Sequence, residues 1–193
     1  MKRALLAFAF VTALAPPVLA QGEPKTPPQA PPQTTEPGAP SPKPRVHVYG
    51  QVFIGESVPD YRLDGSDGLI VRPSRFRGNW ELMVFADRKE MLAPLAAVHD
   101  SLLPFGVSIF GVCREKAHNL RSYSSRLALP FVLGADVTGE VSALFGLYDA
   151  VHSTISPGLL LIDRSGVVRM ALLGQHLPPD QVAALVRYAI AGQ

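Results

Sequence analysis

The chain has 193 residues, of which 47% are hydrophobic and 18% charged, and its formal net charge at pH 7 is +2. Such a weak charge gives no argument for a nucleic-acid partner. The single cysteine excludes an internal disulfide framework and an intramolecular dithiol cycle.

Residues 1 to 20 have the pattern of an export signal. Lys2 and Arg3 supply a basic start, an apolar run extends from Ala4 to Ala15, and Val18-Leu19-Ala20 puts small residues at the usual cleavage positions. Because the run is too short to span a bilayer, we expect a cleaved signal and no membrane span afterwards. The expected location is the periplasm or the outside of the cell. A signal that is retained as a membrane anchor is the alternative.

Residues 21 to 45 form a proline-rich segment, in which nine of twenty-five residues are proline and none is aromatic. Such a segment buries too little apolar surface to fold, so we expect an extended, semi-rigid tether. A ligand for a proline-recognising partner domain is the alternative, but the prolines follow no regular repeat. Residues 46 to 193 are then the single folded domain, because 148 residues suffice for one proper core and not for two.

The first half of this domain begins with strand signals. Val46 to Ile54 alternates loosely between apolar and polar residues and predicts a leading strand, and Val58 to Val71 predicts two short strands around a Gly/Asp turn. The apolar run from Trp80 to Ala86 is typical of a strand buried on both faces. From Lys89 the apolar residues recur every three or four positions, which predicts a helix that ends before Pro104.

The second half alternates strands with helices and ends in a hairpin and a helix. The predicted strands are Val107 to Val112, Phe131 to Gly134, Gly158 to Asp163 and Val167 to Leu173, and the predicted helices are Glu115 to Leu127, Thr138 to Phe145 and Gln181 to Ala191. This order predicts an α/β domain with a central mixed sheet and helices on both of its faces.

Several sequence fragments occur in an order and spacing that resemble a known family. They are Val58-Pro-Asp-Tyr-Arg-Leu63, Phe76-Arg-Gly78, Trp80 to Phe85, Gly106 to Val112, Leu129-Pro-Phe131, Asp136, Phe145-Gly146 and Pro157 to Gly166. Together they resemble the redoxins, meaning the alkyl hydroperoxide reductase/thiol-specific antioxidant (peroxiredoxin-like) family and its thioredoxin-like relatives. The resemblance implies a thioredoxin-like fold.

The resemblance also implies a reactive cysteine directly after the first core strand, and the chain has none there. The family's peroxidatic motif is Pro-x-x-x-Thr/Ser-x-x-Cys, and its reductase relatives carry Cys-x-x-Cys before a segment similar to Arg88-Lys-Glu-Met91. Here only Ala86-Asp87 separates the strand from that segment. We therefore expect that the usual catalytic centre is lost, and no family catalytic residue is carried over to these positions.

Four residues are candidates for a binding groove where that centre would lie. They are Asp87, Arg88, Ser156 and Pro157. Pro157 resembles the cis-proline beside the active loop of thioredoxin-like proteins, and an ordinary trans proline is the alternative. Asp87 and Arg88, together with Glu90, are candidates for a polar patch, whereas helix capping by Asp87 followed by solvent-facing charges is the plainer interpretation. The expected occupant of the groove is a protein or a thiol partner.

Cys113, at the end of the second core strand, is the chain's only thiol. A neighbouring Arg114 would lower its pKa, whereas a free cysteine at a strand end is more often a small buried hydrophobe. Two hypotheses follow. The first is an accessory or binding module that keeps the fold without the chemistry. The second is a one-cysteine antioxidant or oxidoreductase with Cys113 as catalytic residue and an external reductant.

The five histidines are scattered and lack the paired spacing of a metal site. The sequence therefore predicts neither a metal site nor a cofactor.

Overall fold

The apolar run between Gly78 and Asp87 forms strand β3 (Trp80–Ala86), and all seven of its residues are buried. Strand β3 pairs in parallel with β4 (Val107–Cys113) and antiparallel with β8 (Gly158–Ile162). Strand β5 (Val132–Ala135) continues the parallel part beyond β4. The central strands are thus the ones with the most continuous apolar sequences, as expected for a sheet that is covered on both faces.

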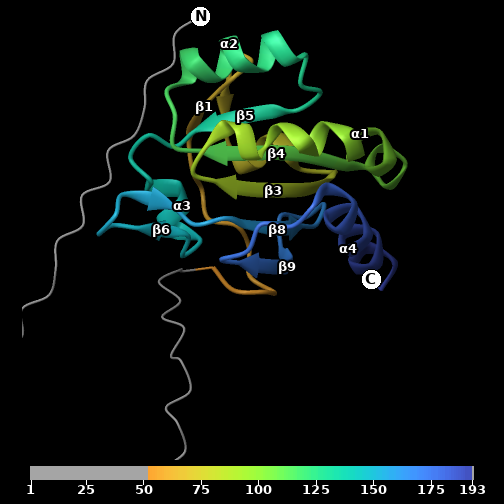
Figure 1. The fold of residues 1–193 in the computed structure, drawn as a ribbon. Helices are drawn as coiled ribbons and strands as arrows, with labels where there is room; N and C mark the ends of the chain where they lie inside the picture. Colours follow the sequence, from red (N-terminus) through yellow and green to blue (C-terminus); the bar gives the residue numbers. More distant parts are fainter. Residues whose placement is uncertain (1–51, 193) are drawn as a thin grey trace, which may run out of the picture. The chain divides into compact units, whose positions relative to one another are not determined.

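The computed structural model describes residues 52 to 192, and its main sheet has the strand order β2-β1-β5-β4-β3-β8-β9 (Figure 1). The outer strands are β1 (Leu63–Gly65), β2 (Ile70–Val71) and β9 (Val168–Leu173), and all pair antiparallel. The sheet is therefore mixed, as predicted. The predicted signal, tether and leading-strand residues 46 to 51 lie outside the described residues.

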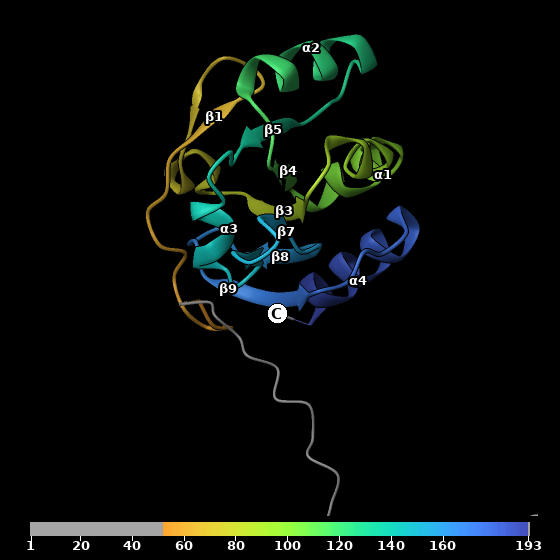
Figure 2. The ribbon, with the colours of Figure 1, turned by 60° about the vertical axis from the view of Figure 1, so that its left-hand side comes forward.

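The two faces of the sheet are covered differently. Helices α1 (Ala96–Leu102), α2 (Ala117–Leu127) and α4 (Pro179–Ala191) pack on the face that carries Leu82 and Val84 of β3. Figure 2 shows α1 beside α4, with α3 on the other side of the sheet.

The other face carries Met83 and Phe85 of β3 and packs against the short helix α3 (Glu140–Leu144). The 3-10 turn η1 (Pro73–Phe76) supplies Phe76 to the same core, with its ring 5.3 Å from the ring of Phe110. Helices on both faces confirm the predicted architecture.

Proline and segment length explain the differences from the predicted elements. The helix expected from Lys89 starts as two 3-10 turns, η2 (Lys89–Met91) and η3 (Ala93–Leu95), because Pro94 cannot donate a helical hydrogen bond. A third such turn, η4 (Leu103–Phe105), follows α1.

The hairpin predicted over residues 58 to 71 is present, but its first strand begins only at Leu63. The sequence did not predict the small hairpin of β6 (Tyr148–Asp149) and β7 (Thr154–Ile155), because two-residue strands are too short to show any periodicity.

Gly134 marks the tightest packing between β5 and its neighbours. A Cβ atom at this position would lie 2.6 Å from Cζ of Phe110 and 3.0 Å from Cδ1 of Leu63. We expect Gly134→Ala to lower the free energy of unfolding by about 1–3 kcal/mol, because the core has to shift to accept the methyl group. Urea denaturation measures this loss.

The control is Gly192→Ala, where the nearest heavy atom to the added Cβ would be 3.7 Å away. We expect this variant to stay within about 0.5 kcal/mol of the parent. Equal stability of the two variants would contradict the close packing around Gly134.

Candidate functional site

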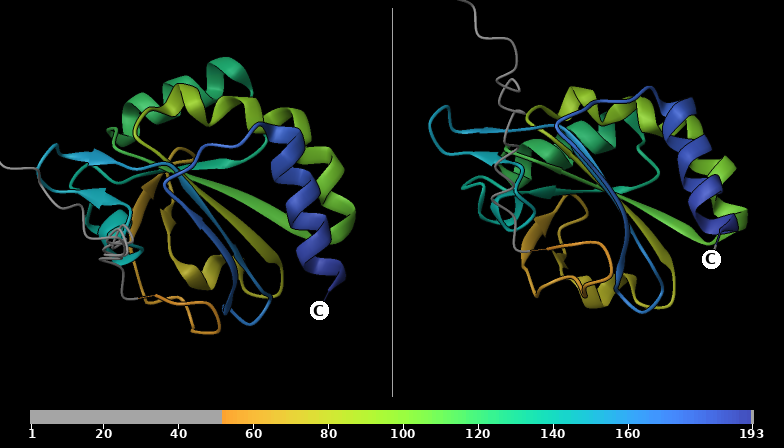
Figure 3. Two further views of the ribbon diagram at one scale, coloured as in Figure 1. Left: turned by 60° about the horizontal axis from the view of Figure 1, so that its bottom comes forward. Right: turned by 90° about the horizontal axis from the view of Figure 1, so that it is seen from below.

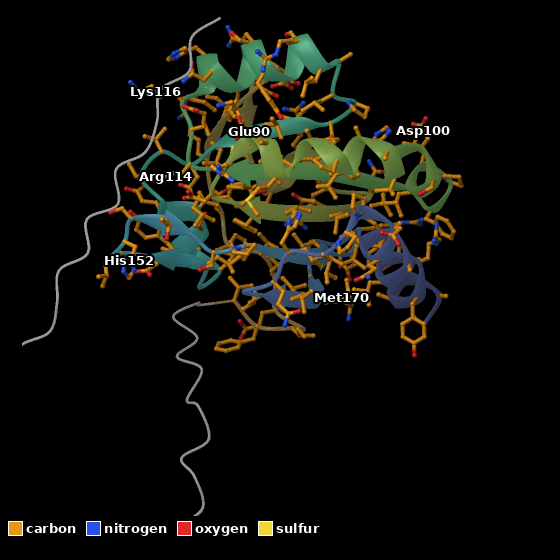
Figure 4. The ribbon with its side chains drawn as sticks, in the orientation of Figure 1. Glu90, Asp100, Arg114, Lys116, His152 and Met170 are labelled. Atoms are coloured by element: carbon orange, nitrogen blue, oxygen red, sulfur yellow. The ribbon has the colours of Figure 1, made fainter. Side chains whose placement is uncertain are left out.

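The carboxyl ends of three parallel strands meet at one edge of the sheet. In the strand register, Ala86 of β3 is opposite Cys113 of β4, which is opposite Ala135 of β5. The polar side chains that follow these strands therefore come together. Figure 4 labels Arg114, Lys116 and His152 at this end of the molecule and Asp100 at the far end.

Asp87, directly after β3, joins three segments of this edge. Its Oδ1 atom accepts a hydrogen bond of 3.0 Å from the backbone N–H of Ile155 in β7, and it lies 3.6 Å from Nε of Arg114. It makes no capping hydrogen bond to the 3-10 turn that follows, whose N-cap residue is Arg88. The carboxylate thus fastens the end of β3 to the segment that leads into β8.

The other three groove candidates lie around this contact. Ser156 and Pro157 follow Ile155 directly and are half-buried, and Arg88 is exposed. The Ser156 N–H donates to the carbonyl of Leu147 at 2.7 Å, and the carbonyl of Pro157 accepts from the Gly174 N–H at 2.8 Å. The Ser156–Pro157 bond is trans, like every peptide bond that the structure describes. The binding role of the four candidates stays a prediction.

A second ionic network covers the same edge beside β4. Lys89 Nζ lies 2.9 Å from Glu115 Oε2, and the other oxygen of Glu115 accepts from Asn119 Nδ2 at 2.8 Å. The hydrogen bonds from Asn119 and Lys89 lower the pKa of Glu115 to about 2. Lys89 also lies 5.7 Å from the centre of the Tyr123 ring, within the range of a cation–π contact. The sequence did not predict this network, because its central contact joins Lys89 of η2 to Glu115, which lies 26 positions later in the loop before α2.

Cys113 lies beneath this network with none of its surface exposed. Burial, followed by the negative charge of Glu115, raises the pKa of the thiol to about 12. Arg114, the residue expected to activate the thiol, is directed to Asp87 instead. A thiol with this pKa is neutral at physiological pH and is a poor nucleophile.

A buried carboxyl group that the sequence did not single out lies at the opposite end of β3. Glu81 is 2% exposed, and its Oε1 atom is 3.4 Å from the hydroxyl of Tyr61. Burial raises the pKa of Glu81 to about 8, and burial together with Glu81 raises the pKa of Tyr61. Glu81 lines a cavity of about 10 Å³ that Arg77 and Asp163 also line, which is room for one water molecule. The sequence signal that could have revealed this group is the position of Glu81, a charged residue within a strand that is predicted to be buried on both faces.

Other kinds of site find no support in the part of the chain that the structure describes. Among residues 52 to 192, no three His, Cys, Asp or Glu side chains lie close enough together to hold a metal ion. None of the helices described is both long and apolar enough to cross a membrane.

The AhpC/TSA family matches residues 54–171 of this chain. Chloroplastic peroxiredoxin Q of Oryza sativa subsp. japonica is 25% identical over 148 residues, which cover 72% of this chain and 68% of that protein. Chloroplastic peroxiredoxin Q of Triticum aestivum is 25% identical over 161 residues, which cover 77% of this chain and 74% of that protein.

Solved structures are similar in fold. A mutant of Xylella fastidiosa PrxQ has a TM-score of 0.61 at 16% identity, covering 72% of this chain and 98% of its own. The peroxidoxin BcpB from Mycobacterium tuberculosis has a TM-score of 0.64 at 16% identity, covering 73% of this chain and 97% of its own. These similarities confirm the predicted thioredoxin-like fold.

The burial of Cys113 predicts that its thiol reacts slowly in the folded protein. With its pKa near 12 in place of 9.0, Cys113 has a thiolate fraction about 1,000-fold below that of a free thiol at neutral pH. We expect Ellman's reagent to label the native protein at least about 100-fold more slowly than the guanidinium-unfolded protein. Equal labelling rates in the two states would contradict the burial of Cys113.

The raised pKa of Glu81 predicts that the free energy of unfolding depends on pH. Below a pH of 4.5 the Glu81 carboxyl is neutral in both the folded and the unfolded protein. Between 4.5 and about 8 only the unfolded chain ionises, so stability falls as the pH rises and levels off above 8. We expect Glu81→Gln to remove this slope and to stabilise the protein by on the order of 3 kcal/mol at neutral pH.

Thermal unfolding between about pH 5 and pH 9 measures the effect, with Glu90→Gln as the matched control because the Glu90 side chain is 57% exposed. A Glu81→Gln variant with the pH profile of the parent would show that Glu81 ionises freely in the folded protein.

Proposed function

Because the chain belongs to the AhpC/TSA family, we propose that it is an exported, tethered peroxiredoxin-like domain that has lost the usual thiol centre. It acts as a binding or accessory module through the edge of the sheet at Asp87. A fold is kept more readily than the activity it once carried, so membership of the family does not require peroxide chemistry. The signal-like residues 1 to 20 and the proline-rich tether support export.

The observation that carries this proposal is the environment at the end of β3. Peroxide reduction by a cysteine needs a thiolate that is accessible to the peroxide. The residue at that place is Asp87, whose carboxylate is engaged with the Ile155 N–H and with Arg114. A carboxylate in two polar contacts holds loops together and does not replace a thiolate as the nucleophile.

The competing function is that of a one-cysteine antioxidant. Cys113 would be oxidised to a sulfenic acid by peroxide, and an external thiol would return it to the reduced form. The complete burial of Cys113 and its raised pKa both weigh against this function.

The surface around Asp87 suits a partner that offers acidic and apolar groups. Arg88 and Arg114 are exposed cations after β3 and β4. Val137, which follows β5 closely, is 50% exposed, and Val151 in the β6–β7 hairpin is 87% exposed. Exposed apolar side chains beside arginine are the composition of a recognition surface, and an extended peptide is a partner of suitable shape.

Peroxide turnover separates the two functions. We expect the full chain to consume hydrogen peroxide and an organic hydroperoxide, with a dithiol reductant present, within about twofold of the rate of reductant alone. The Cys113→Ser variant should have the same rate. Turnover well above background that Cys113→Ser abolishes would establish the one-cysteine peroxidase and refute the proposal.

Binding is tested separately with a photo-crosslinking residue placed at Val151. The control position is Tyr188, which is 82% exposed on α4. A partner of the exported protein should crosslink at the first position alone, and Arg114→Glu should reduce its yield several-fold. Crosslinking of equal yield at both positions would refute binding at this edge.

A further inference from the structure

Three guanidinium groups surround the turn between β8 and β9, at the end of the sheet opposite to Asp87. Figure 3 shows this turn beside the loop that leads into β3. Arg77 donates from Nη1 to the carbonyl of Ser165 at 2.8 Å. Arg169 donates from Nε to Asp163 Oδ2 at 2.7 Å, and its Nη2 forms an ion pair with the same oxygen at 2.7 Å. Arg164 lies on the turn itself, and its guanidinium makes no hydrogen bond or ion pair with the residues that the structure describes.

Asp163, the carboxylate beside these guanidinium groups, already has several hydrogen-bond donors. Asp163 accepts hydrogen bonds from the Ser165 N–H at 2.9 Å, the Ser165 hydroxyl at 2.6 Å and the Val167 N–H at 2.9 Å, in addition to the one from Arg169 Nε. Partial burial opposes its ionisation, but the hydrogen bonds from Ser165, Val167 and Arg169 lower its pKa to about 2. Its negative charge is therefore present at neutral pH and cancels only one of the three positive charges.

The second carboxyl group nearby does not cancel the remaining charge. Glu81 lines the small cavity with Arg77 and Asp163, and on its other side it meets the Tyr61 hydroxyl. Because burial raises the pKa of Glu81 to about 8, its carboxyl group is mostly protonated at neutral pH. The cluster therefore keeps a net positive charge, which an anion would neutralise.

An open hollow of about 430 Å³ lies against this turn. Its lining residues are Trp80, Asp163, Arg164, Ser165, Arg169 and Ile190. Trp80 and Ile190 give it an apolar wall, while Arg164 and Arg169 give it N–H donors. A guanidinium carries five N–H donors, so Arg169 keeps donors beyond those used by Asp163, and Arg164 keeps all of its own.

We propose that this hollow is a binding site for a small oxyanion group, with Arg164 as the principal ligand and Arg169 as the second. Forked guanidinium donors match the paired oxygens of sulfate, phosphate and carboxylate groups. The site lies at the far end of β3 from Asp87 and does not rest on the proposed partner-binding role. The oxyanion belongs either to a free small molecule or to a lipid headgroup.

The chain supplies its own reporter for this site, because Trp80 is its only tryptophan and lines the hollow. We expect sodium sulfate, added to the full chain at constant ionic strength, to change the Trp80 fluorescence in a saturable manner. Inorganic phosphate should do the same, and sodium chloride should not.

Arg164→Gln should weaken sulfate binding at least about tenfold, because the forked contact is lost. Arg164→Lys should weaken it less, because the charge remains. The matched control is Arg121→Gln on α2, which removes an equal charge from an exposed position elsewhere. If Arg121→Gln weakens binding as much as Arg164→Gln does, the effect is general electrostatics and the proposal is wrong.

A pH series in sulfate, which does not titrate in this range, tests the part played by Glu81. Affinity should fall several-fold between about pH 7 and pH 9 as Glu81 ionises beside Arg77, and Glu81→Gln should abolish that fall. The same fall in Glu81→Gln would refute the role of this group.

Vesicles of phosphatidylcholine with added phosphatidylglycerol distinguish the two sources. Sedimentation with these vesicles that Arg164→Gln abolishes, without any response to sulfate, would assign the oxyanion to a lipid headgroup. An absence of Arg164-dependent binding to sulfate, phosphate and vesicles alike would overturn the proposal.

Discussion

The enclosure of strand β3 is the constraint on which the rest of the molecule depends. The strand lies between β4 and β8, and cores cover both of its faces, so all seven residues from Trp80 to Ala86 are buried. A polar side chain within such a strand is removed from water, which has a large desolvation cost, and cannot meet a ligand in solution. Polar groups that are to meet a ligand must therefore lie at the two ends of the strand, where the sheet opens to solvent.

The carboxyl groups near the two ends of β3 have different surroundings. After β3, the Asp87 side chain is one-third exposed and has the Ile155 N–H and Arg114 as partners. Near the start of β3, Glu81 is enclosed beside the Tyr61 hydroxyl, which donates a hydrogen bond to it, and burial raises the pKa of Glu81 to about 8, so it is mostly protonated at neutral pH. Asp87 thus connects loops just beyond one end of the strand, and Glu81 lies below an arginine-rich surface near the other end.

The sequence predicted what depends on local pattern and missed what depends on tertiary contact. The strand from Trp80 to Ala86 was predicted to the residue, because a run of seven residues that is apolar except for Glu81 is too short for a typical helix and suits a buried strand. The contact between Asp87 and Ile155 joins residues 68 positions apart, and no local pattern encodes it. The burial of Cys113 likewise depends on the core that packs against β4, and its pKa also depends on the charge of Glu115, so the sequence left both an active and an inert thiol open.

The separation of the two ends determines how the two proposed sites relate to each other. Seven residues of extended chain span roughly 20 Å, and two unit charges that far apart interact by less than about 1 kcal/mol at an effective dielectric constant of about 20. The charge state of Glu81 therefore has little direct influence on Asp87 or Arg114. A change at one end can reach the other only by moving β3 as a body, and the close packing of Met83 and Phe85 on one face and of Leu82 and Val84 on the other opposes such movement. Substitutions at the two ends should accordingly act independently, so one domain can hold a partner at Asp87 and an oxyanion at Arg164 without coupling between them.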